Sequence, residues 1–373
     1  MQLAIAEARR ALGRSSPNPA VGAVVVREGR VVGSGHTQPP GDAHAEVMAL
    51  RHAGDAARGA TVYCTLEPCA HFGRTPPCTD ALIAAGVAAV HYAIDDPDGQ
   101  VSGRGRRALE AGGIAVTVGD GADEVNAVLA GYLKHRRTGL PLVVVKFAAS
   151  LDGRIAAASG DSRWVSGPQT LAWAHRERQY LDAIVVGSGT VVVDDPTLTA
   201  RPGGTTEGVH QPLRVVVDSR GRTPEQARVL TGPSPTLIAT GDRSPPAWRA
   251  AMAARGAEVV VLPTLPGADG AAHVDLAALL RELGRRGVLV ALFEGGGVLL
   301  GSLFDARLVD RVYAVLAPLI VGAATAPAAV AGRGAERMAD AVRLRDVTVE
   351  RLGEDTLISG VPEWPDAATD GRQ

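Results

Sequence analysis

The stretch CTLEPCAHFGRTPPC (64–78) contains all three cysteines of the 373-residue chain. It continues an apolar run, ATVYCTL (60–66), and leads into a helical pattern, TDALIAAGV (79–87). Three thiols leave one unpaired in any disulfide scheme, and the opening residues, MQLAIAEARRALGR, lack the continuous apolar core of a signal peptide. We therefore predict a cytoplasmic protein whose clustered cysteines bind metal or react.

The overall composition excludes several classes of protein. No apolar run reaches the roughly 18 residues that span a bilayer, which predicts that the chain does not enter membranes. The 38 basic residues balance 40 acidic ones, and only 3% of the residues are aromatic. Such a chain has neither the basic field nor the stacking platform typical of nucleic-acid binding, so we expect no nucleic-acid partner.

Apolar runs alternate with helical patterns along the whole chain. In the first half we expect strands at 20–26, 30–35, 60–66 and 88–94, with helices in the opening residues, at 44–54 and after the cysteine loop. In the second half we expect strands at 142–148, 182–189, 213–219, 235–240, 258–263, 288–297 and 311–320. This alternation predicts α/β layers with functional loops at the strand ends.

A polar stretch, KHRRTGLP (134–141), separates the two halves and is interrupted by Gly139 and Pro141. A length of 373 residues suits two domains at about 100 to 200 residues each. We predict a first domain at 1–140, a second at 141–362, and a disordered tail at 363–373.

The cysteine loop has a partner motif, His44-Ala45-Glu46, at the start of a predicted helix. A zinc-dependent deaminase needs three protein ligands, an open position for water, and a carboxylate that carries protons. The usual signature ends in Pro-Cys-x-x-Cys, whereas eight residues separate Cys69 from Cys78 here. The alternative is a structural zinc knuckle, or no metal at all. Neither alternative explains why a carboxylate, Glu46, lies two residues after His44 at the start of the predicted helix. We predict a catalytic site.

Two residues of the loop allow more than one interpretation. Cys64 lies within the predicted strand, which favours a packed structural thiol over a ligand. His71 could be a fourth ligand of a closed structural site or a residue of the substrate pocket. If His71 were a fourth protein ligand, no coordination position would be left for the catalytic water, so we favour a place for His71 in the substrate pocket.

Together these motifs resemble one family, the bifunctional deaminase/reductases of riboflavin biosynthesis. The resemblance extends over both halves and includes the eight-residue spacing between the last two cysteines. Its blocks are SSPNPAVGAVVV (15–26), HAEVMALRHAG (44–54), TLEPCAHFGRTPPCTDALIAAGV (65–87), KFAASLDGRIA (146–156), SGDSRWVSGPQ (159–169), DAIVVGSGTVVVDDPTLTAR (182–201) and FEGGGVLLGSLF (293–304).

The resemblance implies two successive reactions on a phosphorylated pyrimidine. Zinc-dependent hydrolysis converts 2,5-diamino-6-(5-phosphoribosylamino)pyrimidin-4(3H)-one to 5-amino-6-(5-phosphoribosylamino)uracil and releases ammonia. NADPH then reduces the ribosyl group to ribityl. The implied zinc ligands are His44, Cys69 and Cys78, the implied proton carrier is Glu46, and Asn18 is implied to bind the substrate ring. Taken alone, Asn18 is more simply a turn former.

Without the resemblance, the residues of the second half indicate a function less specifically. Three glycines, 295–297, follow Glu294 at a strand end, and a second glycine-rich turn follows the strand that begins at 182. Such turns let backbone amides approach phosphate, although the glycine spacing is not that of a Rossmann motif. Guanidinium groups suit a ribose phosphate, but Arg178 in HRERQY could equally lie on a solvated helix face.

The resemblance implies a cytidine-deaminase-like three-layer α/β domain followed by a dihydrofolate-reductase-like α/β domain. It also implies pairing of the reductase domains, hence a homo-oligomer. The implied NADPH contacts are Ala148, Trp164, Thr190, Asp194, Ser219, Gly296, Gly297, Val298, Leu299, Leu300, Gly301 and Ser302. The implied substrate contacts of this domain are Ser162, Arg178, Leu198, Arg201 and Glu294. Lys146 follows four apolar strand residues, so we expect its ammonium group to point into the same site and bind the substrate. A nucleoside or nucleic-acid deaminase with an unrelated second domain is the rival enzyme, and a structural zinc protein or nucleotide sensor is the rival without catalysis.

Overall fold

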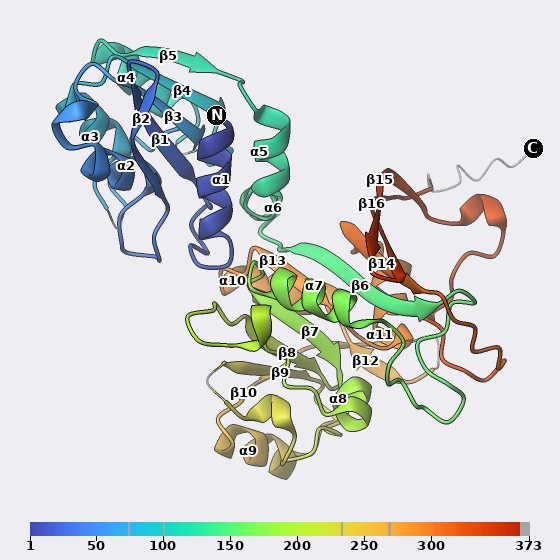
Figure 1. The fold of residues 1–373 in the computed structure, drawn as a ribbon. Helices are drawn as coiled ribbons and strands as arrows, with labels where there is room; N and C mark the ends of the chain where they lie inside the picture. Colours follow the sequence, from blue (N-terminus) through green and yellow to red (C-terminus); the bar gives the residue numbers. More distant parts are fainter. Residues whose placement is uncertain (74, 100, 233, 268–269, 366–373) are drawn as a thin grey trace, which may run out of the picture. The chain divides into compact units, whose positions relative to one another are not determined.

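The computed structural model describes residues 1–365 except 74, 100, 233 and 268–269 (Figure 1). The chain folds into two compact units. Unit 1 consists of Met1–Pro141 together with Gly287–Leu289, and unit 2 of Leu142–Arg286 together with the residues from Val290 onward. No helix in the described part of the chain is both long enough and apolar enough to cross a membrane.

Unit 1 is built on one mixed sheet with strand order β2-β1-β3-β4-β5 in its described residues. Strands β1 and β2 pair antiparallel, as do β1 and β3, whereas β3, β4 and β5 run parallel. The strands are β1 (Gly22–Arg27), β2 (Arg30–His36), β3 (Thr61–Leu66), β4 (Ala89–Ile94) and β5 (Ala115–Val118). The helices are α1 (Gln2–Ala11), α2 (Ala45–Ala53), α3 (Cys78–Ala85), α4 (Arg104–Ala111), α5 (Ala122–Val128) and α6 (Ala130–Thr138), with a short 3-10 helix at Gly54–Ala57.

Glycines allow helices to pack closely on both faces of this sheet. A Cβ at Gly22 would lie 1.9 Å from the Ala4 carbonyl oxygen of α1. A Cβ at Gly33 would lie 2.3 Å from the Ala49 carbonyl oxygen of α2. Because Gly22 and Gly33 face opposite sides of the β1–β2 ladder, α1 covers one face of the sheet and α2 the other. The three-layer α/β arrangement expected for the first domain is confirmed.

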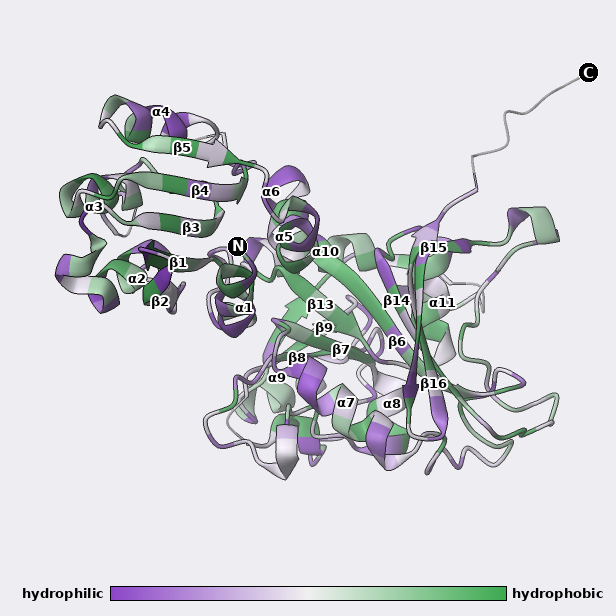
Figure 2. Cartoon of the chain, turned by 45° about the horizontal axis from the view of Figure 1, so that its top comes forward, coloured by the Kyte–Doolittle hydropathy of each residue, from purple (hydrophilic) through white to green (hydrophobic). Residues whose placement is uncertain are grey.

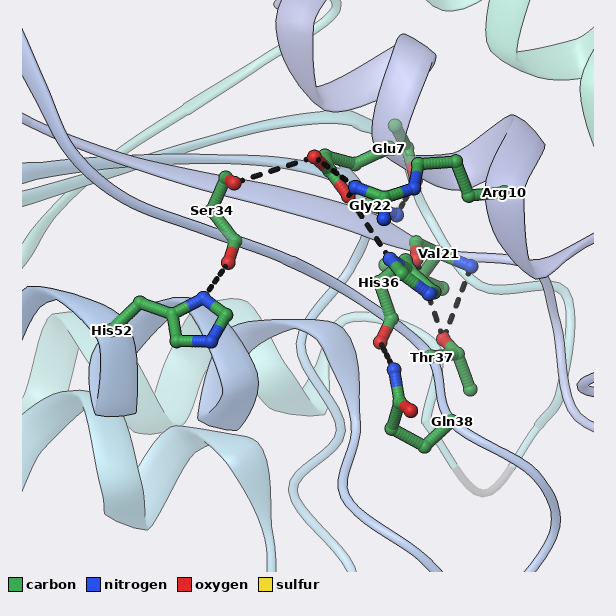
Figure 3. A network of polar contacts seen from close by, with 10 residues as sticks. Glu7, Arg10, Val21, Gly22, Ser34, His36, Thr37, Gln38 and His52 are labelled. Carbon is green, nitrogen blue, oxygen red and sulfur yellow. Dashed lines mark hydrogen bonds and ion pairs between the residues drawn. The ribbon is translucent and has the colours of Figure 1, made fainter.

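A polar network attaches α1 to β2 (Figure 3). The Glu7 carboxylate contacts the Arg10 guanidinium within its own helix, and it accepts a hydrogen bond from Ser34 Oγ at 3.3 Å. His36 Nδ1 lies 3.0 Å from the other carboxylate oxygen. The same strand contacts α2, because His52 Nδ1 lies 2.6 Å from the Ser34 carbonyl oxygen. Polar contacts thus fix the position of α1 across the strand.

Unit 2 is built on a larger sheet with strand order β10-β9-β8-β7-β13-β6-β14-β16-β15 in its described residues. The strands from β10 to β14 run parallel, and β16 and β15 add an antiparallel edge. The strands are β6 (Leu142–Ser150), β7 (Ala183–Gly187), β8 (Leu213–Val217), β9 (Thr236–Thr240), β10 (Glu258–Val261), β13 (Val290–Phe293), β14 (Arg311–Ala317), β15 (Arg343–Leu352) and β16 (Asp355–Glu363). A separate two-stranded sheet pairs β11 (Thr264–Pro266) with β12 (Ala272–Val274).

The helices of unit 2 connect the parallel strands. They are α7 (Pro168–Arg178), α8 (Ser188–Asp194), α9 (Pro246–Ala254), α10 (Leu276–Arg285) and α11 (Gly297–Asp305), with 3-10 turns at Pro202–Gly204, Arg228–Leu230 and Met338–Asp340. Figure 2 shows the central strands β13 and β6 largely in the hydrophobic colour, as expected for parallel strands covered on both faces. The carboxyl ends of these strands lie at one edge of the sheet, where the cofactor and substrate residues are expected.

The structure adds local detail that the sequence did not give. Helix α6 continues into the polar stretch 134–141 as far as Thr138 and ends at Gly139, whose φ of 73° is the left-handed conformation that glycine favours. The β15–β16 hairpin was not foreseen, because β15 is exposed along almost its whole length and its apolar residues are interspersed with charged ones. Strand β16 reaches Glu363, one residue into the predicted tail, and residues 366–373 of that tail lie outside the described residues.

Candidate functional site

The three predicted metal ligands of unit 1 come from three different elements. His44 is the N-cap residue of α2, and Cys78 is the first residue of α3. Cys69 lies in the loop three residues after β3 ends at Leu66. The ligand atoms of these residues all lie within 4.8 Å of one another. Among the residues that the structure describes, no other group of three or more metal-ligating side chains is so placed.

The geometry of this group is that of a nitrogen and two sulfur atoms facing one point. His44 Nδ1 lies 3.5 Å from Cys69 Sγ and 3.3 Å from Cys78 Sγ. The backbone N–H of Cys78 donates to Cys69 Sγ at 3.3 Å. Donation from the Cys78 thiol, together with His44, lowers the pKa of Cys69 to about 4. The hydrogen bond to Cys69 raises the pKa of His44. The site therefore stabilises the thiolate of Cys69, the form in which cysteine binds metal. The hydrogen bond with Cys69 and burial raise the pKa of Cys78, so one thiol proton is shared between the two sulfur atoms in the absence of metal.

Glu46 lies beside the ligand group without belonging to it. Glu46 is only 4% exposed, and burial raises the pKa of its carboxyl group. A carboxyl group with a raised pKa can exchange protons near neutral pH. One nitrogen and two thiolate sulfur atoms fit a zinc ion with a fourth position open to water. Thr75 Oγ1 lies 3.3 Å from His44 Nε2, which leaves Nδ1 to face the metal.

The other residues singled out in this unit have different placements. Cys64 is fully buried in β3, as expected of a packed thiol, and all three cysteines are free. His71 is outside the metal group, and its Nδ1 is buried with no hydrogen-bond partner among the described residues. Asn18 lies in the turn between α1 and β1, where its N–H donates to the Ser15 carbonyl oxygen at 2.8 Å. The substrate contacts of Asn18 and His71 stay predictions.

Glu67 was not recognised from the sequence, although it directly precedes Pro68-Cys69. It is 3% exposed, and its carboxylate accepts hydrogen bonds from the backbone N–H groups of Gly103 at 2.9 Å and Arg106 at 3.2 Å. A further bond comes from the N–H of Asp96 at 3.4 Å. Glu67 thereby connects the loop after β3 that contains Cys69, called the metal loop below, to the start of α4. A glutamate beside Pro-Cys at a strand end was the available signal.

Unit 2 contains a cavity of about 990 Å³ at the carboxyl ends of its parallel strands. This volume is in the range of cofactor sites. Most of the residues predicted for this domain line the cavity, namely Lys146, Ala148, Ser162, Arg178, Thr190, Asp194, Leu198, Ser219, Glu294, Gly296, Gly297, Val298, Leu299 and Ser302. Four others do not line it: Trp164, Arg201, Leu300 and Gly301. Trp164 is 71% exposed, whereas Leu300 is fully buried.

A buried ion pair organises one end of this cavity. Arg178 donates from Nε and Nη2 to the two carboxylate oxygens of Glu294, at 2.9 and 2.7 Å. Although burial alone would raise the pKa of Glu294, the Arg178 charge lowers it to about 2. Burial also lowers the pKa of Lys146, which lines the same end. With one carboxylate against two cations, this end of the cavity retains a positive charge when Lys146 is protonated.

Arg178 was predicted to contact the substrate phosphate, with a solvated helix face as the alternative, and the structure shows it paired with Glu294. Arg201 is also engaged, since its Nη1 donates to the hydroxyls of Thr197 at 2.9 Å and Thr199 at 2.6 Å. Its Nη2 donates to His175 Nε2 at 3.2 Å. Sequence spacing could not reveal these partners, because they are brought together only by the fold.

The two glycine-rich turns are close-packed parts of the same cavity. A Cβ at Gly297, the first residue of α11, would lie 2.3 Å from the Ala328 carbonyl oxygen, so only glycine fits. Beside the other turn, Ser162 Oγ donates to Asp194 Oδ1 at 2.8 Å. The cavity is therefore bounded by backbone at α11 and by a polar pair at α8.

The structure also adds lining residues that the sequence did not suggest. Arg220 and Arg222, in the turn after β8, both line the cavity. His273 and Asp275, at the end of β12 and the start of α10, line it as well. The signal available was a pair of arginines in a turn directly after an apolar strand, VVVDSRGRTP (215–224).

Comparisons with known proteins match both units. Residues 1–94 match the family described as "Cytidine and deoxycytidylate deaminase zinc-binding region", and residues 141–358 match "RibD C-terminal domain". The riboflavin biosynthesis protein RibD of Escherichia coli is 39% identical over 367 residues, which cover 96% of this chain and 97% of that protein. RibD of Mycobacterium tuberculosis is 40% identical over 361 residues, covering 96% and 95%.

Solved structures give the same result. A structure of Acinetobacter baumannii RibD matches with a TM-score of 0.87 at 36% identity and covers 97% of each chain. A Thermotoga maritima structure described as a diaminohydroxyphosphoribosylaminopyrimidine deaminase/5-amino-6-(5-phosphoribosylamino)uracil reductase matches with a TM-score of 0.82 at 30% identity, again covering 97% of each chain. The expected order of a cytidine-deaminase-like domain and a reductase domain is thereby confirmed. The chain belongs to the RibD family, the bifunctional deaminase/reductases of riboflavin biosynthesis.

Proposed function

We propose that unit 1 deaminates 2,5-diamino-6-(5-phosphoribosylamino)pyrimidin-4(3H)-one and that unit 2 then uses NADPH to reduce the ribosyl group of the product to ribityl. The observation that carries this proposal is the convergence of His44, Cys69 and Cys78 beside buried Glu46. The name of the Thermotoga maritima relative supports the choice of substrate. The substrate is a phosphorylated small molecule, which the cavity of unit 2 suits in size.

In the first reaction the chain holds zinc and moves protons. Zinc, when bound to His44, Cys69 and Cys78, supplies the Lewis acidity that makes water nucleophilic near neutral pH. Glu46 takes a proton from the attacking water and delivers it to the departing amine, so that ammonia leaves. Burial raises the pKa of the Glu46 carboxyl group, which favours its taking up the proton in the first of these steps. Thr75 keeps the His44 ring in the orientation that points Nδ1 at the ligand group.

In the second reaction the chain binds and orients. NADPH, when bound, supplies the hydride, and the protein must place the opened sugar against it and exclude water. Arg178 holds the Glu294 carboxylate in one position by hydrogen bonds, and Lys146 supplies a partly desolvated ammonium group at the same end of the cavity. Backbone N–H groups at the start of α11 face the cavity and suit a diphosphate. No single acid or base is indispensable in this arrangement.

A coupled assay tests the proposal. Purified protein is incubated with the diaminopyrimidine phosphate, with and without NADPH, and the products are identified by mass spectrometry. We expect deamination alone without NADPH and the ribityl product only with it. Ammonia release from cytidine or tRNA, but not from the diaminopyrimidine, would support the rival deaminase and contradict the proposal.

A variant separates catalysis from a structural metal site. Glu46→Gln should abolish ammonia release while zinc content and reduction of the deaminated substrate are retained. Glu124→Gln, on an exposed residue of α5, is the matched control and should behave as wild type. Full deamination by Glu46→Gln would contradict the assigned proton carrier. The cytoplasmic location and the homo-oligomer formed through the reductase unit stay predictions.

A further inference from the structure

Helix α4 begins without a capping side chain of its own. Its N-cap residue is Gly103, and its first turn contains no acidic residue. That turn instead contains three arginines, Arg104, Arg106 and Arg107, whose charges have the same sign as the partial positive charge of a helix N-terminus. The first N–H groups of a helix have no acceptor within the helix. At α4 the acceptor must therefore come from another segment or from water.

The carboxylate of Glu67, directly after β3, supplies this acceptor. One of its oxygens accepts from the Gly103 N–H at 2.9 Å, and the other accepts from the Arg106 N–H at 3.2 Å. Gly103 is the N-cap and Arg106 the third residue of the helix, so these are the two N–H groups that a capping box satisfies within one helix. Glu67 is 3% exposed and lies 36 residues before Gly103 in the chain. Glu67 is therefore a buried cap of α4 that another segment provides.

A short and stiff link joins this cap to a proposed metal ligand. Pro68 alone separates Glu67 from Cys69, and the proline ring fixes its own φ. Helix α4 also packs directly on the link, because a Cβ at Gly105 would lie 2.0 Å from the Pro68 carbonyl oxygen. A displacement of the start of α4 therefore moves the backbone of Cys69.

The other contacts of Cys69 lead to α3. The Thr79 N–H donates to the Cys69 carbonyl oxygen at 3.2 Å, and the Cys78 N–H donates to Cys69 Sγ at 3.3 Å. Cys78 is itself one of the three proposed ligands and the first residue of α3. The distance between the two sulfur atoms thus depends on how α3 holds Cys69 from one side and on how Glu67 and α4 hold it from the other.

We propose that Glu67 is a positioning residue of the deaminase site: by capping α4 it keeps Cys69 where zinc binding requires it, so that zinc binding and the order of the first turn of α4 are coupled. This inference rests on the zinc site proposed for unit 1. Glu67 is outside the group of metal-ligating residues and acts only through Cys69. Because coupling between two events is reciprocal, bound zinc should order the start of α4 by the same factor by which the cap strengthens zinc binding.

Glu67→Gln tests the effect of the cap on the metal. The substitution replaces one acceptor oxygen with an NH2 group, which faces a backbone N–H and so breaks one of the two capping bonds. The zinc affinity of the full-length protein, measured in competition with a chelator, should fall about tenfold or more. The thiolate-to-metal absorption of the Co2+-substituted protein should shift, since the Cys69 sulfur moves. Glu110→Gln, on an exposed residue of the same helix whose carboxylate accepts from the Arg106 side chain at 2.8 Å, is the matched control and should keep the wild-type affinity and spectrum.

Hydrogen exchange of the full-length protein tests the coupling in the reverse direction. A peptide that covers the first turn of α4 should exchange about tenfold more slowly in the zinc-loaded wild type than after zinc removal. The first turn of α5, which contains acidic residues of its own, Asp123 and Glu124, is the reference segment and should change less. In Glu67→Gln the effect of zinc on α4 should disappear, whereas in Glu110→Gln it should remain.

The contrary outcomes are distinguishable. A lower Tm of Glu67→Gln with unchanged zinc affinity and an unchanged cobalt spectrum would make Glu67 a purely structural residue and overturn the inference while the zinc site stands. Equal effects of zinc on α4 and α5 would overturn it too, because zinc would then stabilise unit 1 as a whole. Wild type that binds no zinc would overturn the proposed metal site together with the inference. If Glu67→Gln does not fold, the exchange of the wild-type protein alone decides whether α4 is coupled to zinc.

Discussion

Gly105 gives a sharp test of how the metal loop is held, because the expected sign is opposite to the usual one. Alanine in place of glycine within a helix normally stabilises by about 1 kcal/mol. Gly105 lies in α4, but a Cβ there would lie 2.0 Å from the Pro68 carbonyl oxygen. Real contacts of this kind are not shorter than 3.0 Å, so Gly105→Ala must separate α4 from Pro68 by about 1 Å.

The cost can be worked out from the contacts at this point. Overpacking of this kind costs about 1–3 kcal/mol. The two Glu67 hydrogen bonds from backbone N–H groups at the start of α4 are 2.9 and 3.2 Å long, so a shift of this size breaks one or both of them, at about 1.5–3 kcal/mol each. After subtraction of the helix-propensity gain of about 1 kcal/mol, we expect Gly105→Ala to lower the free energy of unfolding by about 1.5–8 kcal/mol. Because Cys69 follows Pro68, deamination should also fall, by about 100-fold for a 1 Å displacement.

The assay combines calorimetric unfolding of the full chain with zinc content and ammonia release. Gly99→Ala is the control, because a Cβ at Gly99 has no neighbour within 4 Å and that glycine lies before the same helix. The control should change stability by less than about 0.5 kcal/mol. If Gly105→Ala unfolds at or above the wild-type temperature and releases ammonia at the wild-type rate, the proposed contact between α4 and the metal loop is refuted.

Three further predictions concern protonation, a buried ion pair and the ligand histidine. Burial raises the pKa of Asp96 to about 6. The folded state therefore favours the protonated carboxyl group, and this contribution is lost as the pH rises from the unfolded pKa to the folded one. The free energy of unfolding of wild type, relative to Asp96→Asn, should fall by about 2–3 kcal/mol between pH 4 and pH 6 and then stay level. Urea unfolding of both proteins at several pH values measures this difference, and an increase of the difference over that range would contradict the prediction. Glu294→Gln leaves Arg178 buried without its carboxylate and should cost about 3–5 kcal/mol, visible as a lower Tm; an unchanged Tm would show that water compensates. Thr75→Val removes the hydroxyl beside His44 Nε2 and should weaken zinc binding about 10–100-fold in competition with a chelator, whereas unchanged affinity would assign Thr75 no role in orienting the ring.

The candidate zinc site could be predicted from the sequence because metal binding and proton transfer each require particular types of side chain. Only thiolate and imidazole supply the soft ligands, and the proton carrier must be a carboxylate near them. His44, Cys69 and Cys78 are also each fixed by a local boundary, a helix start or a strand end, which the sequence marks with proline, glycine and apolar runs. Local signals were thus enough to place all three ligands.

Other features could not be predicted because their partners are far apart in the chain. Glu67 is fixed by backbone N–H groups some 36 to 39 residues later, and backbone groups carry no sequence signal. Arg178 and Glu294 are 116 residues apart, so their pairing arises only when α7 packs beside β13. The edge strand β15 has no buried residue, so its sequence lacks the apolar run that marked the central strands.

The sequence by itself determined the class of fold and the glycine-rich turns, and it was enough to propose His44, Cys69 and Cys78 as metal ligands and Glu46 as proton carrier, since each depends on residue type and short-range spacing. Only the tertiary structure decided which cations remain available to phosphate. Arg178 lines the cavity but is paired with Glu294, and Arg201 donates to threonine hydroxyls outside the cavity lining. Arg220 and Arg222 line the cavity, and no carboxylate among the described residues pairs with them. The physical reason is that a charge is available for a ligand only when no partner in the folded chain has already neutralised or oriented it, and those partners are set by strand order.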